Sequence, residues 1–315
     1  MVSGAEVAQR AGVSRSAVSQ ILNGHTERFT DETVTRVREA ARELGYRPSH
    51  AGRSLRRGRS DVVVTMVHER AVGPQLWDFV NSLGEDLAEV GLTHLLQIAS
   101  PSDAVREAVI GLRPLAVVCT GPLPPGLHGT FAASGITVIE GALSAREAMD
   151  RSIGELQASH LFAAGYPALA PVRPVPDAGY LGTAAREAGA RDWAVRHGMR
   201  VLPTVEIDLA AVDASFDSPD VGLACYNDEV ALAMLGRIAR AGRSVPDDVG
   251  VVGVDDSLIA HISAPTITTI RLNLEISRKA MVQYIVGGDE PDETLPIAPP
   301  PDVTVVQGES TRLPG

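Results

Sequence analysis

The sequence predicts an N-terminal all-α helix-turn-helix headpiece followed by a large α/β body. Three short helical patterns fill residues 1–47, and the chain from residue 61 onward alternates apolar strand patterns with amphipathic helical ones. The headpiece and the body also differ in charge. Residues 1–60 hold eleven arginines and six acidic residues, whereas the whole chain has a net charge of −11. The head is therefore about +5 and the remainder about −16, which is typical of a phosphate-binding module joined to a separate ligand-binding body.

Each headpiece helix has its own start and stop signals. Ser3 and Glu6 have the spacing of a capping box and predict the start of a first helix, which Gly12 ends. A second helix is expected over 14–24, from a serine N-cap to an Asn-Gly stop. The third, over 30–44, carries valine, alanine and leucine at helical spacing. Together the three apolar faces can bury one small core.

The spacing of small and apolar residues favours a helix-turn-helix over an ordinary three-helix bundle. Ala8 is expected where two helices cross, Gly12 where the chain turns tightly, and Val18 where the second helix packs back. A bulky side chain at either of the first two positions would disrupt this corner. The positive charge of the segment favours the same interpretation, because cationic side chains neutralise DNA phosphates.

Three segments resemble the lactose-repressor (LacI) family of transcriptional regulators. They read EVAQRAGVSRSAVSQILNG, TDETVTRVREAARELGYRP and AGRSLRRGRS. The first two cover the headpiece, and the third falls in residues 48–60, which correspond to the family's hinge helix and linker. The resemblance continues more loosely to the C-terminus.

The resemblance also implies an architecture for the body, residues 61–315, as the effector-binding and dimerisation domain. The family has two flavodoxin-like subdomains, the periplasmic-binding-protein type I architecture, and its chain crosses between them three times. The matching crossings are expected near residues 145, 272 and 300. The N-subdomain is then expected at about 61–145 and 273–299, and the C-subdomain at about 146–271 and 300–315.

In the family's headpiece the second helix enters the major groove, and its first exposed residues reach base edges. Those positions here are Arg15, Ser16 and, one turn further, Gln20, with Ser19 a weaker candidate. Arginine suits the two acceptors of guanine, and glutamine can pair with adenine. The alternative for each is a solvated polar side chain. The full DNA-binding set that we predict is Ser14, Arg15, Ser16, Ser19, Gln20, Asn23, His25, Arg53, Leu55, Arg56 and Arg57.

The segment 49–57 is short and contains a glycine, so it is a poor helix by itself. The resemblance implies that it folds only on the operator, beside its dimer mate, and inserts Leu55 into the minor groove. An apolar wedge of this kind kinks the duplex and lets more protein surface make contact. Arg53, Arg56 and Arg57 flank the leucine and can neutralise phosphates. The alternative is a basic flexible linker whose Leu55 packs on the body.

The body alternates between strands and helices, which predicts doubly wound parallel sheets. Proline is rare in central strands, so the Pro-rich segment 168–177 predicts a strand that is displaced, shortened or at an edge. Strands are expected at 61–67, 93–99, 115–120, 136–140, 201–207, 221–226, 249–254 and 303–306. Helical patterns include 77–90, 150–164, 181–197 and 229–241.

A small-molecule effector is expected at the loops after the strands, because ligands of open α/β sheets collect beyond the carboxyl ends of the strands. Arg186, Asn227 and Asp255 match effector-contacting positions of the family. They supply a guanidinium, an amide and a carboxylate, which suit a hydroxyl-rich ligand such as a sugar. Asn227 and Asp255 could instead cap the helices that follow them. Trp77 could pack against an effector ring or belong to the core.

Two positions that are aromatic in sugar-binding relatives are not aromatic here. The residue after Gly189 is Ala190, and the strand that ends near Ile207 is followed by Asp208 and Leu209. These departures leave the chemical identity of the effector open.

The remaining features predict a cytoplasmic protein without a metal or cofactor. Cys119 and Cys225 fall in buried strand patterns of different subdomains, so each is expected to be a small core residue and not half of a disulfide. No signal peptide or apolar run of spanning length is evident. No cysteine and histidine spacing suggests a metal site.

Two functions remain from the sequence. The favoured one is a homodimeric repressor that binds a pseudo-palindromic operator under the control of the effector. No membrane partner is expected. The alternative is an α/β enzyme, or another metabolite-binding protein, fused to a DNA-binding head. The sequence has no nucleophile elbow and no phosphate-cradling glycine loop, which favours the regulator.

Overall fold

The headpiece contains three short helices that the local signals predict well. In the computed structural model, Ser3 and Glu6 form the capping box that starts α1, and Gly12 ends it in the left-handed conformation with φ of 64°. The Ser14 Oγ accepts from the Ala17 amide at the start of α2, and Thr30 caps α3. The helices are α1 (Gly4–Ala11), α2 (Arg15–Leu22) and α3 (Asp31–Glu43).

The described residues are 2–22, 26–46, 59–67, 74–98, 103–121, 123, 126–140, 143–175, 182–209, 220–287 and 302–315. They form two compact units, Met1–Asp61 and Val62–Gly315. The headpiece unit has its own core, in which Val7, Val18 and Val37 are almost fully buried. Because this core draws on all three helices, the headpiece has the apolar packing that a small independent module needs.

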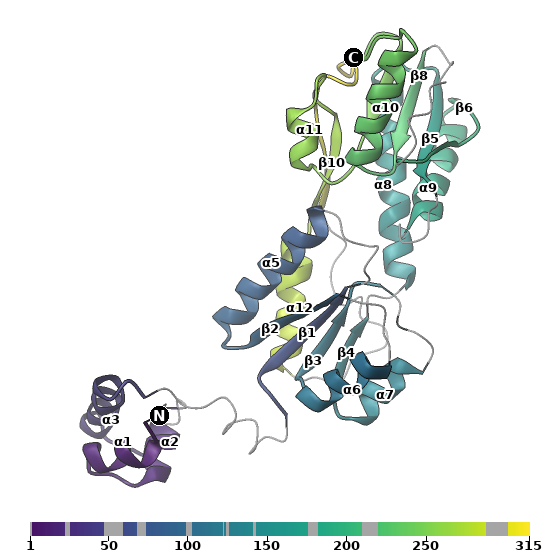
Figure 1. Cartoon of the computed structure of the whole chain (residues 1–315). Coiled ribbons are helices and arrows are strands. Elements are labelled where there is room, and N and C mark those ends of the chain that lie inside the picture. The colour runs from purple at the N-terminus through teal and green to yellow at the C-terminus, as the bar shows by residue number, and fades with distance from the viewer. Residues whose placement is uncertain are drawn as a thin grey trace. The chain divides into compact units, whose positions relative to one another are not determined.

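The first sheet of the body is entirely parallel, in the order β2-β1-β3-β4 (Figure 1). Helices α5 and α12 supply the core on one face, and α6 and α7 supply it on the other. This arrangement confirms the predicted doubly wound sheet. The elements are β1 (Val62–Val67), α5 (Pro74–Glu89), β2 (Thr93–Ile98), α6 (Asp103–Leu112), β3 (Ala116–Cys119), α7 (Leu127–Ala133), β4 (Thr137–Glu140) and α12 (Glu275–Gly287).

The second sheet is also parallel, in the order β6-β5-β8-β9, with β7 as a further partner of β5. Helices α8 and α9 share one core with this sheet, and α10 and α11 share the other. The elements are α8 (Leu143–Ala163), β5 (Ala168–Pro174), α9 (Thr183–Arg196), β6 (Arg200–Val201), β7 (Val205–Ile207), β8 (Val221–Cys225), α10 (Asp228–Arg240), β9 (Val249–Val252) and α11 (Leu258–Ile262).

Two antiparallel strands, β10 (Thr269–Asn273) and β11 (Asp302–Val306), complete the described body. Ile270 of β10 is buried in the α8 and α9 core, whereas Val282 of the following helix α12 is buried against the first sheet. The sequence patterns predicted β11 but not β10. They also placed the start of α8 at residue 150, seven residues too late, because its first two turns have little apolar periodicity.

The interpretation of the Pro-rich segment was wrong, because β5 is a full central strand between β6 and β7 on one side and β8 on the other. The Leu169 carbonyl accepts from Leu202 N, so residues 169, 171 and 173 direct their backbone groups toward β6 and β7. That neighbouring ladder is interrupted at 202–204. The missing N–H of Pro171 therefore falls where no partner strand continues, which makes proline tolerable there.

Pro174 is tolerated for a related reason, since it lies past the last residue of β5 that pairs with β8. The expected single strand 201–207 is also split, into β6 and β7. Pro203 lies in the gap between them and cannot donate to a ladder.

Both cysteines are buried and unlinked, as predicted, with Cys119 in the first sheet and Cys225 in the second. Burial raises the pKa of the Cys225 thiol far above its usual range. Among the described helices, none combines the length and the apolar character that crossing a bilayer requires. Within the same residues, no three histidine, cysteine, aspartate or glutamate side chains come together as a metal site would need.

Candidate nucleic-acid interface and candidate effector site

The first turn of α2 presents the predicted base readers to solvent. Ser14, Arg15 and Ser16 are exposed, and Ser19 and Gln20 are half-buried. The opposite face of α2 is fixed by Val18 and Ile21, which are buried in the headpiece core. The free amides at a helix N-terminus favour anions, so this end suits a DNA phosphate as well as a base edge.

Some polar residues of the headpiece have structural roles. The Ser14 hydroxyl caps α2 through the Ala17 amide at 3.1 Å. Arg36 donates from Nε to the Ala11 carbonyl at 2.9 Å, and Arg10 forms an ion pair with Glu43 at 2.8 Å. These two arginines therefore stabilise the packing of α3 against α1. The predicted contacts Asn23, His25, Arg53, Leu55, Arg56 and Arg57 lie outside the described residues.

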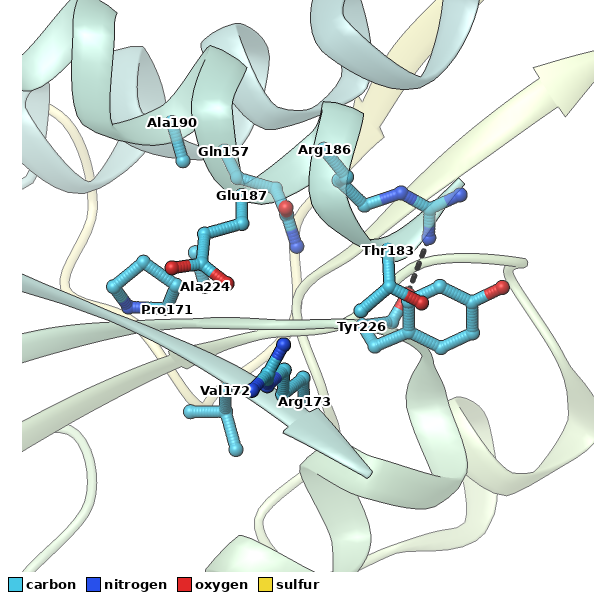
Figure 2. A pocket seen from close by; sticks show the side chains of 10 residues that line it. All are labelled: Gln157, Pro171, Val172, Arg173, Thr183, Arg186, Glu187, Ala190, Ala224 and Tyr226. Carbon is cyan, nitrogen blue, oxygen red and sulfur yellow. Dashed lines mark hydrogen bonds between the residues drawn. The ribbon is translucent and has the colours of Figure 1, made fainter. Parts of the chain in front are cut away.

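The body has a small cavity at the carboxyl ends of β5 and β8, covered by α9 (Figure 2). Of the predicted effector residues, Arg186 lines it. The full lining is Gln157, Pro171, Val172, Arg173, Thr183, Arg186, Glu187, Ala190, Ala224 and Tyr226. The position matches the general rule that ligands of open α/β sheets bind beyond the carboxyl ends of the strands.

Arg186 is held from three sides. One terminal nitrogen donates to the Tyr226 carbonyl, and the other donates to Asp150 Oδ1 at 2.5 Å (Figure 2 shows the first of these bonds). Its Cζ lies 4.6 Å from the centroid of the Tyr226 ring, which is cation–π distance. The side chain is only 12% exposed, so its guanidinium is oriented before any ligand arrives.

Asp150 and Gln157 were missed as site residues, although α8 carries a usable signal for both. They are 1% exposed and share the buried face of the helix with Ile153 and Leu161, at spacings of three and four residues. Polar side chains at core positions of a helix indicate a specific partner. For Gln157 the partners are the carbonyls of Cys225, at 2.8 Å from Nε2, and Val252, at 3.3 Å.

Asn227 is buried and caps α10, since its Oδ1 accepts from the Val230 amide at 3.0 Å. The capping interpretation therefore holds for its carbonyl oxygen. The amide nitrogen is the part of this side chain with which it could serve a ligand.

Asp255 is not a helix cap, because Ser257 occupies the N-cap position of α11. Its backbone φ of 105° lies in a region that residues other than glycine rarely adopt. Burial raises the pKa of the Asp255 carboxyl to about 7, against the attraction of the Arg186 guanidinium. A carboxyl with a pKa near 7 is partly ionised at neutral pH, and its ionised form is a strong acceptor for a ligand hydroxyl.

Trp77 lies on α5, in the part of the body built on the first sheet, and does not line the cavity. It is 38% exposed and belongs to none of the core clusters of the described residues, so the core interpretation was wrong. Two further charged residues do line the cavity: Arg173 pairs with Glu206, and Glu187 accepts from Thr204 and Arg191. Sequence patterns gave no sign of this network, because it joins β5, β7 and α9.

The raised pKa of Asp255 makes stability depend on pH. In the folded chain this carboxyl holds its proton up to about pH 7, whereas in the unfolded chain it loses it near its ordinary value of 3.8. Between these limits the folded state binds more protons, so stability falls as pH rises. Asp255→Asn is expected to remove this part of the slope and to be more stable than the wild type at pH 8. Urea unfolding of both proteins from pH 5 to 8 measures the difference, and parallel curves would contradict it.

Two family models match the chain. Residues 5–49 match bacterial regulatory proteins of the lacI family, and residues 158–311 match a periplasmic binding protein-like domain. The transcriptional regulator CelR of Thermobifida fusca is 27% identical over 92% of this chain and 93% of its own length. The sucrose operon repressor of Escherichia coli is 28% identical over 92% of this chain and 95% of its own length.

Solved structures share the fold over nearly the whole chain. The Lac repressor dimer bound to operator and the anti-inducer ONPF superimposes with a TM-score of 0.75 at 18% identity, covering 99% of both chains. The complex of the regulator CelR with cellobiose gives 0.60 at 23% identity, covering 98% of this chain and 100% of that one. The chain therefore has a DNA-binding domain of the lacI family at its N-terminal end and a periplasmic binding protein-like domain in its body.

Proposed function

We propose that this chain is a sequence-specific transcriptional repressor whose operator binding is controlled by a small-molecule effector in the α/β body. The observation that carries the proposal is the guanidinium of Arg186, which Asp150 and the Tyr226 carbonyl hold in the body cavity, in a chain that also exposes Arg15 on its helix-turn-helix. A preformed polar site in one unit and a base-reading helix in the other are what ligand-controlled DNA binding requires. The relatives support the same function, since they are named as transcriptional regulators and operon repressors.

The effector that the site suits is a sugar or a related polyhydroxyl metabolite. Arg186 lines the cavity and offers donors. Asn227 and Asp255 lie outside the cavity lining, and we propose that they add an amide donor and a carboxyl acceptor for ligand hydroxyls. CelR is solved with cellobiose, which supports this class of ligand. The cavity is lined by Ala190 and by the aromatic ring of Tyr226, which offers an apolar face to a sugar ring.

We propose that the functional species is a cytoplasmic homodimer on a pseudo-palindromic operator. One headpiece with a single exposed helix end offers few contacts, and two related half-sites double the base-reading energy. The effector would act by changing the relation between the subdomains, and thereby the spacing of the two hinge segments 48–60. We propose no catalytic role for the chain.

Two measurements test the function. Sequencing of genomic fragments captured by the purified full-length chain should enrich a two-fold related site, and failure to enrich one would refute operator binding. Thermal unfolding with cellobiose and with sucrose, combined with chromatography of the incubated sugar, tests the body. Stabilisation without product supports a regulator, whereas product that depends on Asp255 would favour the fused enzyme.

The hinge gives a separate prediction. Leu55→Ala should weaken operator binding at least 10-fold at fixed salt, because the apolar wedge that kinks the minor groove is lost. Thermal stability of the body should not change. Fluorescence anisotropy with the enriched operator measures the effect, and Leu209→Ala, which truncates an exposed leucine of the body, is the matched control. Unchanged affinity of Leu55→Ala would show that the segment is only a linker.

A further inference from the structure

A second aspartate, Asp228, is fully buried at the start of α10 and does not line the cavity. Its Oδ2 accepts from Ser257 twice, from the amide at 2.8 Å and from the hydroxyl at 2.9 Å. Its Oδ1 accepts from the Thr269 hydroxyl at 2.7 Å. A buried carboxylate is costly to desolvate unless it is fully hydrogen-bonded, so three donors indicate a carboxylate that is retained for a specific structural purpose.

The residues that Asp228 binds enclose a strained turn. Asp255 and Asp256 have φ of 105° and 50°, and the chain around them holds no glycine closer than Gly253. Two successive non-glycine residues with positive φ cost free energy, and such strain persists only where the surroundings over-determine the backbone. Ser257 follows the turn directly, and Thr269 lies opposite it on β10.

Thr269 is the link between Asp228 and the turn. Its hydroxyl accepts from the Asp256 amide at 3.1 Å and donates to Asp228, so the carboxylate fixes the direction of the hydroxyl hydrogen. The turn is also held by its own backbone, because the Asp255 amide donates to the Ile270 carbonyl at 2.9 Å. The two anchors of the turn, Thr269 and Ile270, are thus neighbours on β10.

The loop before Asp255 packs directly against the Asp228 carboxylate. A Cβ built on Gly253 would lie 2.1 Å from Asp228 Oδ1, so the loop before Asp255 runs in direct contact with the carboxylate. The Asp228 amide donates to the Val254 carbonyl at 3.0 Å. Asp228 therefore contacts the chain before the strained turn, after it and across from it.

We propose that Asp228 is a positioning residue for effector binding: through Ser257 and Thr269 it holds the Asp255–Asp256 turn in the conformation that sets the position of the Asp255 carboxyl. Asp228 itself does not contact the effector. The role of the turn in ligand binding rests on the proposed function, whereas the hold of Asp228 on the turn does not.

The test uses the full-length chain without ligand, and variants of Thr269 and Asp228. Thr269→Val keeps the shape of the side chain and removes the hydroxyl, while Thr269→Ser restores the hydroxyl. Asp228→Asn keeps the shape and removes the charge. Circular dichroism establishes that each variant is folded, and Thr269→Val decides the question if Asp228→Asn does not fold.

The readouts are amide hydrogen exchange at Asp256 and Ser257 and the ¹³C-detected titration of the Asp255 carboxyl, assigned with Asp255→Asn. In Thr269→Val the two amides should exchange at least 10-fold faster. The carboxyl should titrate below the wild-type pKa of about 7, because it leaves its poorly hydrated position. Thr269→Ser should resemble the wild type in both measurements. A folded Thr269→Val with wild-type exchange and wild-type titration would overturn the proposal.

A ligand arm separates this proposal from the function on which it rests. Calorimetry with cellobiose and with sucrose measures affinity in the wild type, Thr269→Val and Thr269→Ser. If the wild type binds a sugar, Thr269→Val should bind it at least 10-fold more weakly, and Thr269→Ser should bind it as well as the wild type. Equal affinity of all three proteins would overturn the positioning role. If the wild type binds neither sugar, the proposed effector class fails, and the ligand-free readouts still decide whether Asp228 holds the turn.

Discussion

Arg15→Ala and Gln20→Ala are each expected to remove sequence-specific operator binding while the headpiece stays folded. Both side chains project from the accessible face of α2, and the core residues Val18 and Ile21 fix that helix from its other face. A bidentate contact to a base is worth about 1–3 kcal/mol of discrimination, which corresponds to about 5-fold to 150-fold for one half-site. A dimer makes each contact twice, so the loss on a full operator should be about 2–6 kcal/mol, which is about 30-fold or more. Anisotropy titration with the operator and with a scrambled duplex measures the specific and the nonspecific affinity.

The control for charge is Arg38→Ala, since Arg38 is exposed on α3 and outside the predicted set. Arg15→Ala and Arg38→Ala remove the same positive charge, so both should weaken binding to the scrambled duplex to a similar and small extent. Only Arg15→Ala should lower the ratio of operator to scrambled affinity. If the two variants change that ratio equally, α2 is not the base-reading helix, and the predicted set at its start must be abandoned.

The headpiece could be predicted from sequence because each of its signals is local. Ser3 with Glu6, Gly12 and Thr30 mark helix ends through bonds to residues three or four positions away. Such bonds form in any chain that has these residues at these spacings. The start of α10 was also predicted to within one residue, and there too a local cap, Asn227, marks the helix end.

The candidate effector site could be predicted only in part, because its geometry depends on residues far apart in the chain. Arg186 was predicted, but its partner Asp150 lies 36 residues earlier on α8 and was not. The central position of β5 was also missed, since the gap between β6 and β7 that accommodates Pro171 is visible only in the paired sheet. Nonlocal packing overrides a local proline signal in this case.

Asn227 and Asp255 show where residue type alone is ambiguous. Both precede helices, so the sequence allows either a cap or a ligand contact at each. The structure separates them, because Asn227 bonds the Val230 amide as a cap, whereas the cap position of α11 belongs to Ser257. The strained backbone of Asp255 then marks it as the residue whose position is set by its surroundings and not by its own helix.

Gly189→Ala is expected to destabilise the body strongly, because α8 and α9 are in contact through two glycines. A Cβ at Gly189 would lie 2.0 Å from the Arg151 carbonyl oxygen, and one at Gly154 would lie 2.0 Å from that of Arg186. Both clashes are with helical backbone, so no side-chain rotation can relieve them and the helices must separate. Overpacking typically costs about 1–3 kcal/mol, and we expect the upper end of this range here because backbone must move. Urea unfolding of the full-length chain measures the loss.

Gly111→Ala on α6 is the matched control, since a Cβ there meets nothing within 4 Å. It should stabilise the chain by about 0.5–1 kcal/mol, because alanine replaces glycine in an open helix position. The two substitutions are chemically identical, so opposite signs isolate the cost of separating α8 and α9. Separation would also displace Arg186, which is on α9, from Asp150, which is on α8, and sugar binding should weaken together with stability. A Gly189→Ala variant as stable as the wild type would mean that the helices are not in backbone contact, and the fixed orientation of Arg186 would lose its physical basis.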